Sequence, residues 1–119
     1  MKRFPGSVYD HGSEPDPRFT LANERTFLAW CRTSLALISI AVALDNISVR
    51  IDPTVKLAVV LTVMAMGIAL PAAAWRDWAH NEKAMRVSAP LPSSLAQLLL
   101  AAGVTVCSAA MLIGMVMAW

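Results

Sequence analysis

The stretch LANERTFLAWCRTSLALISIAVAL, residues 21–44, decides the fold of this protein. It opens with charged residues and then becomes almost wholly apolar, which predicts a helix that begins in water and crosses a membrane. From Phe27 to Leu44 the helix would extend about 27 Å, close to the thickness of the hydrocarbon core. Arg32 nevertheless lies inside the apolar part, and any account of function has to explain this arginine.

The composition indicates a membrane protein throughout. Of the 119 residues, 57% are apolar and 15% are charged, whereas soluble domains carry about 25% charged residues. A chain this short cannot bury so much apolar surface in its own core. We therefore predict an all-α membrane protein with three transmembrane helices over residues 21–44, 55–85 and 95–119, the second with a cytoplasmic extension. Residues 1–18, rich in Pro, Gly, Asp and Ser, predict a flexible cytoplasmic tail.

Lysine and arginine are unevenly distributed around the predicted spans. The tail, the start of the first helix and the second connection hold seven of them: Lys2, Arg3, Arg18, Arg25, Arg76, Lys83 and Arg86. The first connection offers only Arg50 and Lys56. Because basic flanking segments remain in the cytoplasm, we predict that the N-terminus lies inside and the C-terminus outside.

A seven-residue pattern divides the first span into two stripes. One stripe holds two sets of residues at the a and d spacing of a helix seam: Ala22, Ala29, Ala36 and Ala43, and Arg25, Arg32 and Ser39. The opposite stripe carries large apolar side chains: Phe27, Trp30, Leu37 and Ile38. We expect the large apolar stripe to face lipid and the small and basic stripe to form a helix-packing seam.

Two interpretations of Arg32 remain open. The apolar residues of this span contribute about −4 kcal/mol to insertion, and a central arginine costs about 2.5–3.5 kcal/mol, so the helix inserts with little margin. Arg32 either reaches the cytoplasmic headgroups, with Arg25 as a topology signal, or it lines a contact between copies of the chain. Rings of arginine in such a contact would attract phosphate-bearing anions. Glu24 would then hold a neighbouring arginine, or merely favour the positive end of the helix.

Other residue types predict no chemistry. Cys31 and Cys107 lie in apolar stretches and are expected to be small buried side chains. Neither Cys nor His recurs at zinc-ligand spacing, and no set of catalytic residues is apparent. We expect no metal, no cofactor, no enzymatic activity and no nucleic-acid partner.

Two segments carry a family resemblance. DPRFTLANERTFLAWCRTSLALISIAVALD, residues 16–45, resembles the DUF202 family of small three-span membrane proteins, and WAHNEKAMR, residues 78–86, is similar to its bacterial YidH branch. The resemblance implies a multi-pass protein of the bacterial cytoplasmic (inner) membrane.

Better understood relatives are the membrane parts of the vacuolar transporter chaperone complex, a eukaryotic polyphosphate polymerase. There, similar domains form a five-membered ring whose first helices line a polyphosphate path. By this resemblance Arg25 is implied to face a pore, with Glu24 as its structural neighbour, Arg18 at the mouth and Arg76 as a further match. No role for Arg32 is implied. The resemblance implies a pentamer, and the seam alone would also suit a trimer.

These observations lead to two hypotheses. The first is a homo-oligomer, surrounded by membrane lipids, whose first helices line a basic axis that binds or conducts phosphate-rich anions such as polyphosphate. The sequence carries no polymerase domain, so we expect any conduit to need a partner or a preformed polymer. The alternative is a structural or assembly partner of other membrane proteins that transports nothing.

Overall fold

The computed structural model describes residues 3–119, and every regular element in this range is a helix. The elements are α1 (Gly6–Tyr9), α2 (Pro17–Asn46), α3 (Pro53–Arg86) and α4 (Leu95–Met117). The three long helices are each long and apolar enough to cross a membrane, which confirms the prediction of an all-α protein with three spans. Lys2, counted above for orientation, lies outside the described residues.

Two of the long helices begin with an aspartate followed by a proline. The Asp16 carboxylate accepts a hydrogen bond from the Arg18 backbone N–H at 2.9 Å, and the Asp52 carboxylate accepts one from Val55 N–H at 3.2 Å. The proline in the first helical position has no N–H to leave unpaired. As a result α2 begins before the apolar segment that predicted it.

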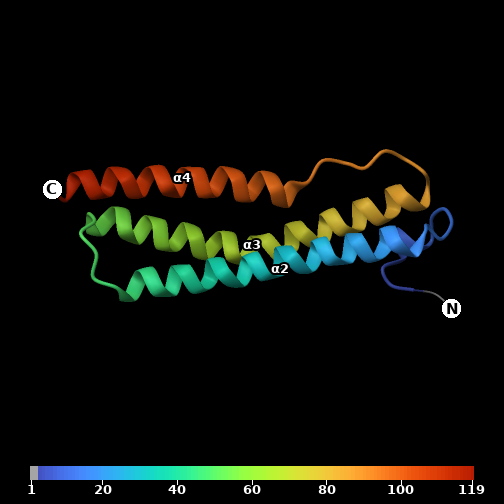
Figure 1. Ribbon diagram of the computed structural model, residues 1–119, viewed down its shortest axis with the longest axis horizontal. Coiled ribbons are helices and arrows are strands. Elements are labelled where there is room, and N and C mark those ends of the chain that lie inside the picture. Colours follow the sequence, from blue (N-terminus) through green and yellow to red (C-terminus); the bar gives the residue numbers. More distant parts are fainter. Residues whose placement is uncertain (1–2) are drawn as a thin grey trace.

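The central helix of the bundle is α3. In Figure 1, α2 and α4 each lie along α3 and run in the opposite direction to it. The molecule is elongated, 60 Å by 24 Å by 21 Å. The N-terminal segment and the α3–α4 connection lie at one end and the C-terminus lies at the other. Three crossings therefore put the tail and this connection on the same side of a membrane.

The face of α2 that packs on α3 follows a heptad of its own: Asn23, Phe27, Trp30, Ser34, Leu37, Ala41 and Leu44. Leu37 is buried, and the Phe27 ring meets the Trp75 ring edge-on at 6.1 Å. The prediction that the large apolar stripe faces lipid is therefore wrong. Apolar character does not distinguish the two surroundings, because lipid tails are as apolar as the side chains of a neighbouring helix.

Contacts at the start, in the middle and at the end of α4 attach it to α3. At its start, Asp77 of α3 accepts hydrogen bonds from the Ser94 hydroxyl and from the backbone N–H groups of Leu95 and Ala96, at 2.7–2.9 Å. In the middle, Gly103 lies against the Met66 side chain. At the end, the Gly114 carbonyl accepts a hydrogen bond from Asp52 N–H at 3.1 Å.

The N-terminal segment differs from the flexible tail that the composition predicts. Val8 in α1 is 1% exposed, and the Ser13 N–H donates to the Arg86 carbonyl at 3.0 Å. Gly12 has a φ of 59°, and a Cβ there would collide with the same carbonyl. Residues 3–16 thus fold over the end of α3, held by contacts that composition cannot show.

Candidate functional site

The candidate site is the face of α2 that does not contact α3. All the residues of the predicted seam are exposed: Ala22, Arg25, Ala29, Arg32, Ala36, Ser39 and Ala43. None of the ion pairs within residues 3–119 involves Arg25 or Arg32. Two guanidinium groups therefore lie, without a partner from the described protomer, on a surface made mostly of alanine.

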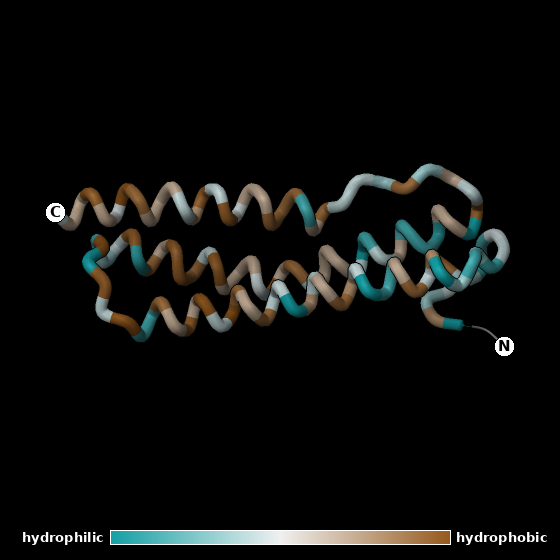
Figure 2. The backbone as a smooth tube through the Cα atoms, in the orientation of Figure 1, coloured by the Kyte–Doolittle hydropathy of each residue, from teal (hydrophilic) through white to brown (hydrophobic). Residues whose placement is uncertain are grey.

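The register between the helices gives the depth of these arginines. The Asn23 amide donates to the Trp78 carbonyl at 3.0 Å, so the level of Arg25 is close to that of Asp77, where α4 begins. Arg32 follows seven residues later, which is about 10 Å further along the helix axis. Figure 2 shows hydrophilic residues concentrated at the tail end of the bundle and continuing partway along α2. Arg25 thus lies level with the start of α4, and Arg32 lies about two helical turns further into the apolar part of the bundle.

Arg18 continues the same row one heptad before Arg25. Its guanidinium donates to the Asp16 carboxylate at 2.9 Å, and its side chain is 85% exposed. Hydrogen bonds from the Arg18 side chain and then from its backbone N–H lower the pKa of the Asp16 carboxyl. The first arginine of the row therefore has an ion-pair partner in its own helix cap, unlike the next two.

Glu24 and Arg76, the other predicted site residues, are exposed but do not join this row. Glu24 forms no ion pair within residues 3–119, although it directly precedes Arg25. Arg76 lies nine residues after Gly67, whose carbonyl accepts a hydrogen bond from Ser34 of α2. Nine residues are two and a half helical turns, so Arg76 lies on the side of α3 away from α2.

One further seam residue is missing from the sequence prediction. Asn46 follows Ser39 by seven residues and is exposed at the end of α2, where its amide donates to the Val42 carbonyl at 2.7 Å. The row therefore reads arginine, arginine, arginine, serine, asparagine along the helix. The spacing could have found Asn46, but its turn-forming neighbours assigned it to the first connection.

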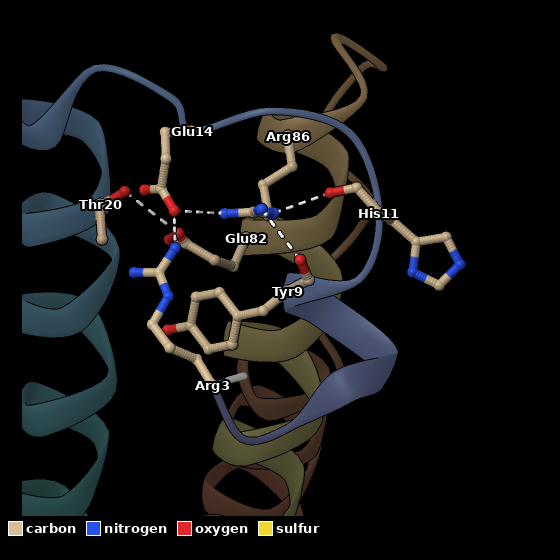
Figure 3. A network of polar contacts seen from close by, with 7 residues as sticks. All are labelled: Arg3, Tyr9, His11, Glu14, Thr20, Glu82 and Arg86. Atoms are coloured by element: carbon tan, nitrogen blue, oxygen red, sulfur yellow. Dashed lines mark hydrogen bonds and ion pairs between the residues drawn. The ribbon is translucent and has the colours of Figure 1, made fainter. Parts of the chain in front are cut away.

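A second polar cluster lies where the tail crosses the end of α3, and sequence reasoning missed it entirely (Figure 3). Arg86 donates to the carbonyls of Tyr9 at 3.0 Å and His11 at 2.8 Å, and to the Glu14 carboxylate at 3.1 Å. Glu82, one turn earlier on α3, accepts a hydrogen bond from the Thr20 hydroxyl at 3.1 Å. These contacts join residues more than sixty positions apart, so no local spacing indicates them.

Comparison with known proteins identifies relatives of this chain. The profile of a domain of unknown function, DUF202, matches residues 18–84, which cover α2 and nearly all of α3. The inner membrane protein YidH of Escherichia coli K12 is 43% identical over 84 residues, 68% of this chain and 71% of that protein. An uncharacterized protein of Mycobacterium tuberculosis is 46% identical over 85 residues, 66% of each chain. No solved structure matches the chain.

The chain belongs to the DUF202 family. Its similarity to an inner membrane protein and its three apolar helices identify it as a multi-pass protein of the inner membrane, as the resemblance implied.

Proposed function

We propose that the protein assembles as a homo-oligomer in which exposed α2 faces surround a basic axis, and that this axis binds or conducts phosphate-rich anions such as polyphosphate. The tail and the α3–α4 connection face the cytoplasm, as the distribution of Lys and Arg favours. The ring would be a pentamer, as in the related complexes, or a trimer, which the same seam would suit. The proposed function involves no catalytic step, metal or cofactor.

One observation carries the proposal: Arg32 is exposed and without an ion pair in the described protomer, about 10 Å beyond the level of the α4 start. A guanidinium in lipid at such depth costs a few kcal/mol, and intramembrane arginines usually face protein or a water-filled cavity. A second copy of α2, or a wet axis between several copies, would supply that environment.

The shape of the face supports contact between copies. Alanine side chains at every seventh position allow a second helix to approach closely. A ridge of larger exposed side chains flanks them: Leu21, Leu28, Leu35 and Val42. A ridge beside a row of small residues is the arrangement that interdigitates between identical helices.

The charge pattern supports a phosphate-rich ligand. Arg18, Arg25 and Arg32 lie on one face at intervals of about 10 Å. Guanidinium groups match phosphate oxygens in geometry and charge, and a repeated row suits a repeated anion better than a single small ion. Beyond Arg32 the row continues with Ser39 and Asn46, so polar groups follow the face to the other end of α2.

The test is anion binding and flux with the purified, reconstituted protein. Arg32→Gln and Arg25→Gln should each reduce tripolyphosphate binding about tenfold or more, because a charged hydrogen bond contributes about 1.5–3 kcal/mol. Lys83→Gln, an exposed cation on α3, is the matched control and should change binding little.

Two outcomes would overturn the proposal. If the arginine variants bind and conduct anions like the parent, the arginines do not form an anion site. If the mass in detergent and in nanodiscs is that of a monomer, no axis between copies exists. A monomer recovered in a defined complex with another membrane protein would favour the alternative, a structural or assembly partner.

A further inference from the structure

We propose that Arg3 and Arg86 form a second anion site, which the Glu14 carboxylate of the chain itself occupies in this structure and for which a phosphate group from solution competes. This site shares no residue with the α2 face, so it does not depend on the oligomer or on conduction.

Two guanidinium groups converge on one carboxylate oxygen (Figure 3). Arg86 Nη1 lies 3.1 Å from Glu14 Oε1, and Arg3 Nη2 forms an ion pair with the same oxygen. The other carboxylate oxygen, Oε2, accepts no hydrogen bond from residues 3–119. Glu14 thus accepts from the two arginines through only one oxygen, whereas a tetrahedral anion such as phosphate would offer them several acceptor oxygens.

The two arginines are held by groups other than Glu14. The Arg86 side chain is 6% exposed and donates to the Tyr9 and His11 carbonyls, which fix its plane. The Tyr9 ring lies 4.3 Å from the Arg3 guanidinium carbon and 5.3 Å from that of Arg86. The donors would therefore remain in place if Glu14 turned away.

Glu14 is the weakly held member of the cluster. Its side chain is 64% exposed, and it lies between α1 and α2, where the backbone is fixed by Gly12 and Ser13 rather than by the carboxylate. An exposed carboxylate exchanges between its partner and water at little cost. Because it is tethered, it acts as a competitor at a high effective concentration, which lowers the apparent affinity for any free anion.

Charge and position define the ligand. Paired guanidiniums suit phosphate better than chloride because they donate to several oxygens at once. Glu82, close to the cluster on α3, is 1% exposed, whereas the Glu14 side chain is 64% exposed, so an anion would reach the two arginines from the side where Glu14 lies. Arg86 is nine residues past Asp77, about 13 Å beyond the start of α4, which favours a solution phosphate over a lipid headgroup.

The test measures binding of inorganic phosphate and of tripolyphosphate to the full-length protein in nanodiscs. Glu14→Gln should tighten binding about five- to tenfold, because it removes a competitor and a repulsive charge. Arg3→Gln, at a side chain 47% exposed, should reverse this gain in the Glu14→Gln background without unfolding the tail. Asp45→Asn, at an exposed acid near the far end of α2, is the matched control and should leave binding unchanged.

Each result decides the question. Unchanged binding in Glu14→Gln, or a gain that survives Arg3→Gln, would overturn the site. So would a gain that appears only in zwitterionic nanodiscs and vanishes in anionic ones, since a lipid headgroup would then occupy the site in place of phosphate. Repeating the series with Arg32→Gln distinguishes the two proposals: the effect of Glu14 should persist there even if the basic axis does not exist.

Discussion

Asp77 joins α3 to α4 through a single carboxylate. It accepts three hydrogen bonds, two of them from the first backbone N–H groups of α4, and is 6% exposed. A negative charge at this position also favours the positive end of the helix dipole. The side chain therefore sets both the start of α4 and its height along α3.

Replacing Asp77 should loosen this attachment. Asp77→Ala leaves the N–H groups of Leu95 and Ala96 without a partner, and we expect a loss of about 2 kcal/mol or more. Hydrogen exchange should accelerate at residues 95–97. Asp45→Ala, at an exposed acid near the end of α2, serves as control; equal exchange in both variants would contradict the role of Asp77.

Gly67 lies where α3 packs closely against α2. A Cβ there would lie 2.6 Å from Ile38 Cγ1 and 3.3 Å from the Ser34 carbonyl oxygen, and neither group moves easily. Overpacking at Gly67→Ala should therefore destabilise the fold by about 1–3 kcal/mol, which would be measured as a lower melting temperature. At Gly103 an added methyl meets the flexible end of Met66, so Gly103→Ala is the milder comparison, and equal losses would refute the distinction.

The helices themselves were largely predictable, and their faces were not. Hydropathy and length give three spans, because a membrane demands about 20 apolar residues in each. The heptad in α2 correctly separates two stripes, yet it does not show which stripe contacts α3. Lipid tails and the side chains of α3 are equally apolar, so hydropathy does not distinguish the two contacts. The exposure of Arg25 and Arg32 follows from their stripe, whereas the Arg86 cluster depends on contacts across the whole chain.

The folded tail depends on one backbone conformation. Gly12 adopts a positive φ directly over the Arg86 carbonyl, which disfavours any side chain at that position. Gly12→Ala should release residues 3–16, so that limited proteolysis cuts there several times faster while the three spans remain intact. Ser7→Ala, at an exposed site in α1, provides the comparison. Unchanged cleavage in Gly12→Ala would show that the tail does not need this turn.

The single chain has two outer surfaces of different character. One is the alanine and arginine face of α2, and the other is the apolar outer face of α4, which carries Leu98 and Leu112. Since α3 lies between them, copies that meet through α2 leave α4 for lipid (Figure 1).

Cysteine crosslinking distinguishes these surfaces. After Cys31 and Cys107 are replaced, Ala36→Cys should form a disulfide-linked dimer in membranes, because small residues bring helix axes close. Leu112→Cys should remain monomeric under the same oxidation. Efficient linkage through position 112, with none through position 36, would place α4 and not α2 at the subunit contact.

The sparse attachment of α4 has a consequence for how the family diverges. Only 11% of its most apolar window is buried, and the family profile ends at residue 84, before α4 begins. Substitution among apolar residues on its outer surface costs little, so the third span should drift fastest between species and adapt to bilayers of different thickness. Ala96, Gly103 and Gly114, which touch α3 or its preceding turn, should be the positions that drift least.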